Sequence, residues 1–337
     1  MKYSKGVELL EKLRWGILGT ASIGKRSVIP GIQESTSNEV VAVASRSMEK
    51  ASDFAKEVGI PHAYGSYEEL LADPEIDAVY IPLPNHLHKP WTIKAAQAGK
   101  HILCEKPIAL NADEAKEMVT VCKEENVLLA EAYMYRHQPR YEEIKSRIQA
   151  GEIGDIRGIH GVFTFNNATD FENIRYTKEW GGGSIYDVGC YPISAARLLL
   201  DEEPLAVTTQ AFFSQKHGGV DMMASGLMEF SNGVALTFDC SMWASGRNEL
   251  EILGSDGRII LKNAFLGDQT YQIVKGDKIE TIQQENKNPY ALQADDFATS
   301  VLNGKPLKFS YENLIAGIKS VKAALDSAEK NERIILS

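Results

Sequence analysis

Cysteine is scarce in this sequence: four occur among 337 residues, at Cys104, Cys122, Cys190 and Cys240. They form no C-x-x-C pair and no cluster with histidine, which argues against a disulfide framework and against a zinc site. Isolated cysteines of this kind are typical of free thiols in a reducing compartment. We therefore expect a cytoplasmic protein whose cofactors do not include a metal.

Long apolar runs and an excess of positive charge are also lacking. No run approaches the length of a membrane span, and the charged segment 1–13 lacks a signal-peptide core and predicts a short amphipathic lead-in. With 36 basic and 46 acidic residues the formal net charge is -10, which argues against nucleic acid as the main partner. The remaining expectation is a soluble protein that acts on a small molecule and is long enough for two domains.

Strands and helices alternate along the first 130 residues. The predicted strands are 15–19, 40–46, 60–64, 78–81, 102–104 and 127–130, and the predicted helices are 48–58, 67–71, 89–98 and 112–125. Alternation at this spacing predicts a parallel, doubly wound sheet. We take residues 1–130 as one α/β domain.

The pattern changes after residue 130, where strands follow one another with few helices between them. The predicted strands are 156–165, 205–213, 224–230, 234–242, 249–253, 258–261 and 271–274, and the predicted helices are 139–148, 289–302 and 311–330. Asn232-Gly233 and Asp256-Gly257 are typical hairpin turns. Residues 131–337 are thus predicted to form an α+β domain with a large, mostly antiparallel open sheet.

A glycine loop follows the first strand and precedes a helical stretch. It consists of Gly19, Thr20, Ala21, Ser22, Ile23 and Gly24. Strand, glycine loop and helix in this order are the context of a dinucleotide fingerprint and indicate a Rossmann domain. Ala21 stands where the middle glycine is expected, which restricts the approach of the backbone to a pyrophosphate. Taken alone, the loop is also compatible with a structural turn.

The end of the second strand bears on the choice of cofactor. An acidic residue about 20 positions after the loop would hold the ribose 2′-hydroxyl of NAD, but Ser45 and Arg46 stand there instead. A hydroxyl and a guanidinium suit a 2′-phosphate, because arginine binds phosphate through two parallel hydrogen bonds. We therefore expect NADP(H) to be preferred, with NAD(H) possible.

Two further strand ends carry polar residues where open α/β sheets bind ligands. Glu105, Lys106 and Pro107 end the strand 102–104, and either a ligand-binding lysine or a surface Glu-Lys pair fits this pattern. After the strand 78–81, a loop predicted to lie beneath the nicotinamide contains four candidate cofactor contacts: Pro82, Pro84, Asn85 and His88. The prolines stiffen this loop, and the two polar side chains could bind cofactor or substrate. For the histidine alone, a loop residue whose ring nitrogens are satisfied within the protein is the alternative.

The second chemical stretch is 181–192, in which three glycines precede Asp187, Tyr191 and Pro192. Asp187 and Tyr191 are four residues apart, so a helical turn places them on one face. Pro192 predicts a helix start or a kink. A capping aspartate and a packed tyrosine are the plain structural alternative for this pair.

Taken together, these motifs resemble the Gfo/Idh/MocA oxidoreductases over nearly the whole chain. The shared stretches are 19–24, 84–88, 105–107, 131–136 and 181–191. The resemblance implies that Lys106, Asp187 and Tyr191 form the catalytic set. Tyrosine at 191 resembles the branch of glucose–fructose oxidoreductase, dimeric dihydrodiol dehydrogenases and NADP-dependent xylose dehydrogenases. The resemblance to the family also implies a homodimer or homotetramer formed through the C-terminal sheet.

The implied reaction is reversible hydride transfer between NADP and a CH–OH or C=O group of a sugar, polyol or cyclic diol. Tyr191 would carry the proton, and Lys106 is expected to lower its pKa. Asp187 would orient the substrate or the tyrosine, and Glu105 would meet the cofactor ribose. Arg136 and Arg175 are the expected charged substrate contacts, with structural ion pairs as the alternative. A non-enzymatic NADP-binding sensor on the same fold is the competing function.

Overall fold

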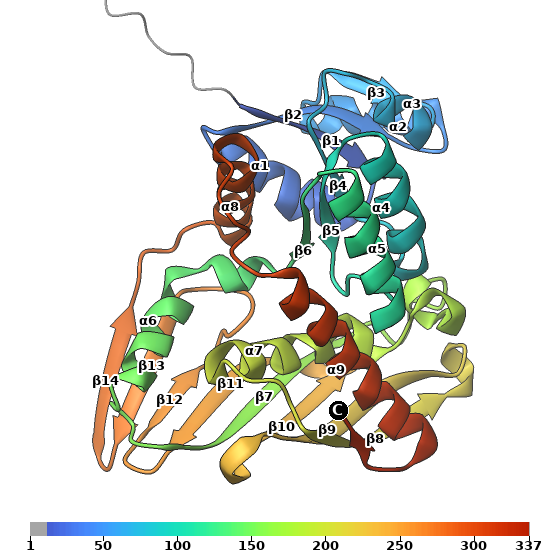
Figure 1. Cartoon of the computed structure of the whole chain (residues 1–337). Helices are drawn as coiled ribbons and strands as arrows, with labels where there is room; N and C mark the ends of the chain where they lie inside the picture. The colour runs from blue at the N-terminus through green and yellow to red at the C-terminus, as the bar shows by residue number, and fades with distance from the viewer. Residues whose placement is uncertain (1–11, 337) are drawn as a thin grey trace, which may run out of the picture.

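The computed structural model describes residues 12–336, so the predicted lead-in lies outside the described residues except for its last two, of which Leu13 opens the first strand. The first layer is a parallel six-stranded sheet (Figure 1). Its strands lie in the order β3 (His62–Tyr64), β2 (Asn38–Ala44), β1 (Leu13–Leu18), β4 (Ala78–Ile81), β5 (His101–Glu105) and β6 (Leu129–Ala132). The predicted doubly wound sheet is confirmed.

Polar side chains cap the starts of three of the five α-helices between these strands. The five helices are α1 (Ile29–Glu34), α2 (Met48–Val58), α3 (Tyr67–Leu71), α4 (His88–Gln97) and α5 (Ala112–Glu124). The side chain of Ser47 accepts a hydrogen bond from the Lys50 backbone N–H, and that of Asn111 accepts one from the Glu114 N–H. Such caps satisfy amides that have no partner inside the helix. Apolar strands alternating with capped helices therefore produce this layer.

The second layer is a nine-stranded sheet. Its order is β14 (Lys278–Gln283), β13 (Thr270–Lys275), β12 (Arg258–Leu261), β11 (Trp243–Gly254), β7 (Ile156–Asn166), β10 (Ala235–Ser241), β9 (Val220–Glu229), β8 (Ala206–Ser214) and β15 (Ile334–Ile335). Only β10 and β7 pair in parallel; every other neighbouring pair is antiparallel. The mostly antiparallel sheet is thus confirmed, and both predicted hairpins are present, between β9 and β10 and between β11 and β12.

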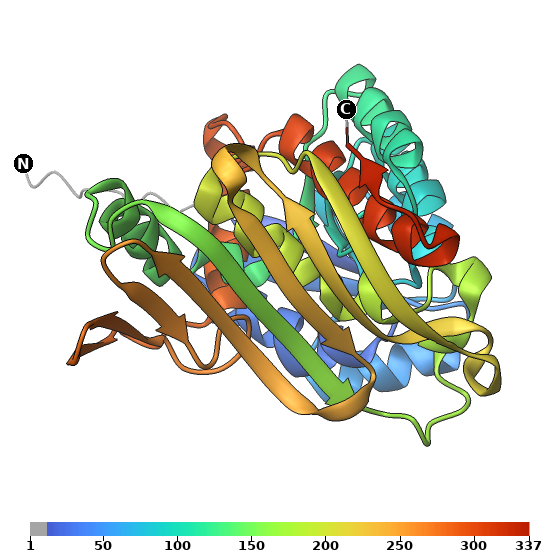
Figure 2. The same ribbon diagram turned by 90° about the horizontal axis from the view of Figure 1, so that it is seen from below.

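Helices cover one face of this sheet and leave the other open (Figure 2). The covering helices are α6 (Pro139–Gln149), α7 (Cys190–Leu200) and α9 (Tyr311–Lys330). Side chains alternate accordingly along β11, where Leu250 and Ile252 are buried while Glu249 and Glu251 are only half-buried. Period-two alternation of this kind is what a sheet with one packed face requires.

Besides the connecting chain, a helix from the C-terminal part of the sequence packs on the first layer and joins the two layers. The first sheet ends at Ala132, and helix α8 (Pro289–Asn303), from the second predicted domain, packs back on α1 (Figure 1). The rings of Trp15 and Phe297 lie 5.3 Å apart in the core of the first layer. Gly31 of α1 allows α8 to pack this closely, because a Cβ atom at position 31 would lie 2.5 Å from the Cβ atom of Tyr290. The start of α8 is thereby held beside the glycine loop.

No helix within residues 12–336 has both the length and the apolar character needed to cross a membrane.

Candidate active site

A cavity of about 580 Å³ lies where the carboxyl ends of the parallel strands face the second layer. The first layer contributes residues that directly follow β1, β4, β5 and β6, and the second contributes residues of β7 and of the segment 174–191. In open α/β sheets ligands bind at this edge. Side chains from both predicted domains therefore meet in one space.

The glycine loop forms one wall of the cavity. Gly19 has φ +117°, a conformation that favours glycine, and its N–H donates to the Ala44 carbonyl oxygen at 2.9 Å. Ala21, Ser22 and Ile23 line the cavity, while Gly19, Thr20 and Gly24 flank that lining. The loop leads directly into a π-helical turn, Gly24–Val28.

The end of β2 adjoins this loop through the Gly19–Ala44 hydrogen bond. Ser45 is buried, and its N–H donates to the Tyr64 carbonyl oxygen at 3.1 Å. Arg46 is exposed to solvent. Both residues lie beyond the cavity lining, on the side of the loop where an extended dinucleotide would place its adenosine ribose.

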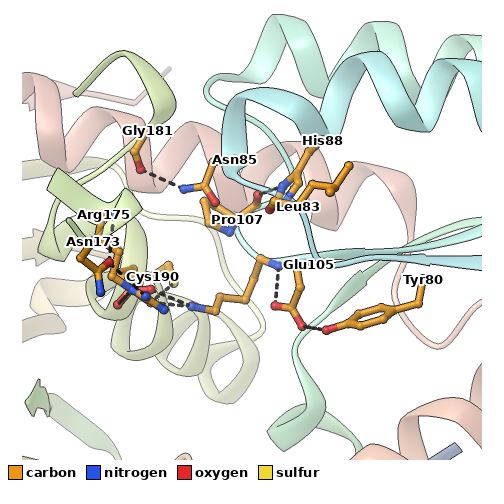
Figure 3. Close-up of polar contacts among 12 residues, drawn as sticks. Tyr80, Leu83, Asn85, His88, Glu105, Pro107, Asn173, Arg175, Gly181 and Cys190 are labelled. Atoms are coloured by element: carbon orange, nitrogen blue, oxygen red, sulfur yellow. Dashed lines mark hydrogen bonds and ion pairs between the residues drawn. The ribbon is translucent and has the colours of Figure 1, made fainter. Parts of the chain in front are cut away.

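The loop after β4 closes the opposite wall. Pro82, Pro84 and Asn85 line the cavity, and the Asn85 amide donates to the Gly181 carbonyl oxygen at 2.9 Å (Figure 3). Gly181 has no room for a side chain, because a Cβ atom there would lie 2.4 Å from Leu110. This contact ties the glycine-rich segment to the first layer.

The prediction that His88 contacts the cofactor is wrong. The side chain is fully buried, and its two ring nitrogens lie 2.9 Å from the Pro107 carbonyl oxygen and 2.7 Å from that of Leu83 (Figure 3). Burial lowers the pKa of His88 to about 4. His88 therefore braces the two loops that border the cavity instead of facing a ligand.

Glu105 lies at the end of β5 and lines the cavity. The Tyr80 hydroxyl donates to its Oε1 at 2.6 Å, and the Lys106 N–H donates to its Oε2 at 3.2 Å (Figure 3). Burial raises the pKa of Glu105 against the opposing effect of the Lys106 charge. Its position at the lining is compatible with the predicted ribose contact.

Lys106, Asp187 and Arg175 form a connected charged group. The Lys106 Nζ donates to the Asp187 carbonyl oxygen at 2.6 Å and lies 3.5 Å from Oδ1, while the Arg175 Nε lies 2.7 Å from Oδ2. Burial opposes the charge on Asp187, but the two cations outweigh it and lower its pKa. Burial likewise opposes the charge on Lys106, but Asp187, Cys190 and Glu105 together outweigh it and raise the pKa of the lysine. Both side chains are thus ionised.

Tyr191 lies in the second turn of the helical segment that carries Asp187, and its ring packs among Tyr133, Phe163 and Phe265. The Lys106 Nζ lies 5.0 Å from the centre of the Tyr191 ring. The prediction that Lys106 lowers the pKa of Tyr191 is wrong for this structure, because burial raises the pKa of the phenol well above its ordinary value. The phenol is therefore protonated at neutral pH.

The prediction that Arg136 contacts the substrate is also wrong. Arg136 is 4% exposed and lies outside the cavity lining. Its Nε donates to Ser194 Oγ at 2.8 Å, and its Nη1 donates to Asn313 Oδ1 at 3.1 Å. The guanidinium also lies over the Tyr133 ring. Arg136 therefore joins α7 and α9 to the end of the first sheet.

Several lining residues were not predicted from the sequence. Trp180 lines the cavity, is 40% exposed and stacks on His86 with ring centres 5.0 Å apart. Tyr290 reaches the lining from the start of α8, and Phe165 and Leu266 come from the second layer. A proline at the helix start marks α8 in the sequence, but no local signal shows that this helix returns to the glycine loop.

Within residues 12–336 there is no group of three or more histidine, cysteine, aspartate or glutamate side chains that could hold a metal ion. The four cysteines are buried and unpaired.

A Rossmann layer whose strand ends share a cavity with ionised lysine and aspartate side chains is typical of dinucleotide-dependent oxidoreductases. Family models agree: residues 13–133 match the oxidoreductase family with an NAD-binding Rossmann fold, and residues 141–260 match the GFO/IDH/MocA C-terminal domain. The chain belongs to the Gfo/Idh/MocA oxidoreductase family.

Relatives of this chain cover almost its full length. An uncharacterized oxidoreductase of Rhizobium meliloti is 39% identical, with 95% of this chain and 98% of the relative covered. The D-xylose 1-dehydrogenase (NADP(+)) 2 of Haloferax volcanii is 37% identical, with coverage of 96% and 100%. A 3-ketoreductase from Actinomadura kijaniata, solved with NADP and TDP-benzene, superposes with a TM-score of 0.89 at 29% identity, with coverage of 94% and 98%.

Proposed function

We propose that this oxidoreductase transfers hydride reversibly between NADP(H) and a CH–OH or C=O group of a sugar, polyol or cyclic diol. The observation that carries the proposal is the convergence of Lys106, Asp187 and Tyr191, from two different layers, on one cavity at the carboxyl edge of the Rossmann sheet. The nicotinamide would supply or accept the hydride, and the protein would position the substrate and move the proton.

Tyr191 is the proposed proton carrier. Its phenol lines the cavity and, within residues 12–336, has no hydrogen-bond partner that would withhold its proton. Because burial raises its pKa, the neutral phenol is the form present at pH 7 and is ready to donate to a carbonyl oxygen. Oxidation of an alcohol requires the phenolate, so its rate should rise with pH.

Lys106 and Asp187 are the proposed electrostatic and orienting groups. The Lys106 ammonium lies beside the Tyr191 ring and stabilises negative charge that develops on the reacting oxygen. Asp187 holds that ammonium, and its carboxylate can accept a hydrogen bond from a substrate hydroxyl. Arg175 neutralises Asp187 from the cavity side and is the proposed charged substrate contact.

NADP(H) is the proposed cofactor. Gly19 with its positive φ, and the helical turn that follows Ala21 to Ile23 at the cavity, fit a pyrophosphate. Arg46 is exposed and, within the described residues, forms no ion pair, so its guanidinium is free to meet a 2′-phosphate. The Haloferax relative named for NADP(+) and the Actinomadura structure holding NADP support the same choice.

Self-association through the open face of the second sheet is also proposed. Exposed apolar side chains on its strands include Phe212, Leu227 and Leu253, and the face is not covered by helices (Figure 2). Analytical ultracentrifugation of the purified chain tests this. A dimer or tetramer is expected that weakens on Leu227→Lys, and a monomer at all concentrations would contradict it.

The activity is tested by following cofactor absorbance at 340 nm. NADPH with aldehydes, ketoses and cyclic ketones, and NADP with aldoses, polyols and cyclic diols, cover both directions. We expect turnover with at least one compound, with alcohol oxidation faster at higher pH. Tight cofactor binding without turnover on any compound would favour a sensor.

A further inference from the structure

A buried carboxylate outside the catalytic group holds the start of the helix that carries Asp187 and Tyr191. Asp221 lies on β9 and is 1% exposed. Its Oδ2 accepts hydrogen bonds from Ser184 Oγ at 2.8 Å and from the Ile185 N–H at 2.7 Å. A carboxylate at the first amides of a helix is favourably placed, because these amides have no partner within the helix.

Gly183 shows how closely this carboxylate is seated. It has φ +114°, and a Cβ atom there would lie 1.9 Å from Asp221 Oδ1. The Gly183 N–H donates to the Arg175 carbonyl oxygen at 3.0 Å, and the Gly183 carbonyl oxygen accepts from the Asp187 N–H at 3.1 Å. The backbone of Gly183, beneath the carboxylate, is thus hydrogen-bonded directly to the backbone of two of the three members of the charged group, Arg175 and Asp187.

We infer that Asp221 is a positioning residue that acts through Ser184, Ile185 and Gly183 to hold Asp187 and Tyr191 in register with Lys106. The role in turnover rests on the proposed function, while the positioning itself does not. Small displacements of reacting groups cost up to about 10²-fold in rate, so looseness at this turn should lower kcat, while the cofactor, which is held by the loops of the first layer, should keep its affinity.

Although the amides at the helix start favour a carboxylate, burial outweighs them, so the charge on Asp221 lowers the stability of the folded protein. Within the described residues Asp221 forms no ion pair. The charge of Asp221 raises the pKa of Lys178, but the Lys178 ammonium is paired with Glu329 at 2.8 Å. Burial raises the pKa of Asp221 to about 6. Because this folded-state pKa lies above the ordinary value, ionisation makes the native state less stable as pH rises through 4 to 6. An uncharged isostere should therefore not lower stability at pH 7.

Protons can reach this group from a second cavity of about 400 Å³, which Asp221 lines behind Gly181 and Gly182. The titratable groups that sense Asp221 are Lys178, Tyr186 and Cys240, whose pKa values are all raised above their ordinary values. None of the three titrates between pH 5 and 7, so a step there in the behaviour of this turn belongs to Asp221.

Asp221→Asn tests the inference, with Asp239→Asn as matched control. Asp239 lies on the neighbouring strand β10, where it accepts a hydrogen bond from Ser225 on the open face. For Asp221→Asn we expect unchanged NADPH affinity, a melting temperature at pH 7 no lower than that of the unmodified chain, and a kcat reduced about 10- to 100-fold. The unmodified enzyme should also lose kcat below about pH 6, and the variant should lack this step. The control should change none of these.

Hydrogen–deuterium exchange of segment 183–191 separates this inference from the proposed function. Faster exchange in Asp221→Asn, and in Ser184→Ala should the first variant fold poorly, supports the positioning role even if no substrate is found. Unchanged exchange, or a kcat that falls only in proportion to the folded fraction, overturns it. Absence of turnover in the unmodified chain with exchange altered as expected would count against the proposed function alone.

Discussion

The Nζ atom of Lys106 donates a hydrogen bond to the backbone carbonyl oxygen of Asp187 at 2.6 Å and lies 3.5 Å from the carboxylate of the same residue. Lys106 follows the fifth strand of the Rossmann sheet, and Asp187 precedes helix α7 of the second layer. The contact therefore fixes a cation where the two layers meet. With 14% and 15% of their side chains exposed, both residues are shielded enough for their charges to interact strongly.

Replacing Lys106 by alanine should keep NADPH binding and remove most turnover, by about 10²-fold or more, because the charge beside the reacting oxygen is lost. It should also raise the pKa of Asp187, which then retains only Arg175 as a cation. Steady-state kinetics measure the loss of turnover, and NADPH fluorescence titration measures the affinity for the cofactor. Lys89→Ala is the control, since Lys89 forms only a surface ion pair with Glu117. Loss of folded protein together with activity would assign Lys106 a structural role.

Tyr191→Phe should preserve the aromatic packing and lower turnover by about 10²–10⁴-fold, the usual contribution of a general acid or base. Because burial raises the pKa of the phenol, alcohol oxidation by the unmodified enzyme should rise continuously toward alkaline pH, and the variant should lose this rise. Tyr135→Phe, which alters a neighbouring ring in the same cluster, controls for packing. Near-full activity with the same pH profile in Tyr191→Phe would assign the proton to another group.

The fold was largely predictable because its signals are local. Helices at 48–58, 67–71 and 311–330 and strands at 78–81 and 258–261 have the predicted bounds. Strand β14 was missed because its side chains are almost all exposed, so Lys278 to Gln283 carry no apolar alternation. Its pairing with β13 is made by backbone hydrogen bonds, which any sequence without proline can supply.

The site was only partly predictable because it depends on where distant segments meet. Helical spacing placed Asp187 and Tyr191 on one face, and a strand end placed Lys106 at the ligand edge of the sheet. Only the family resemblance brought the three residues together as one set. Arg136 was misassigned because its partners Ser194 and Asn313 lie 58 and 177 residues away in the chain. The pKa of Tyr191 depends on burial by aromatic side chains of several segments, which no spacing rule describes.

Ser45→Asp should reverse the cofactor preference, because a carboxylate at the end of β2 would repel a 2′-phosphate and accept hydrogen bonds from a ribose 2′-hydroxyl. Isothermal titration with NADP and NAD measures the two dissociation constants. Arg46→Ala should weaken the binding of NADP and leave the binding of NAD unchanged. Equal or tighter NAD binding by the unmodified chain would show that the strand end does not select the phosphate.

His88→Ala should destabilise the protein at pH 7 by about 1–3 kcal/mol, since one buried carbonyl oxygen loses the single N–H that the neutral imidazole donates. The folded-state pKa of about 4 lies below the ordinary value of 6.5, so the native state binds fewer protons than the unfolded chain between these values. The stabilising contribution of His88 is therefore present above about pH 6.5 and declines as pH falls toward 4. Chemical denaturation at pH 7 and 4.5 measures it, with His160→Ala on the open sheet face as control. A gap between unmodified and variant protein that grows at pH 4.5 would contradict this sign.

The most direct test of hydride transfer by this site is a stopped-flow single turnover of the NADPH-bound enzyme with a carbonyl compound identified in the substrate screen. We predict a fast absorbance decrease at 340 nm in the unmodified enzyme, and equal NADPH occupancy with a decrease slowed at least about 10²-fold in Tyr191→Phe. Equal single-turnover rates in the two proteins, or NADPH that stays reduced with every carbonyl compound, would contradict the account.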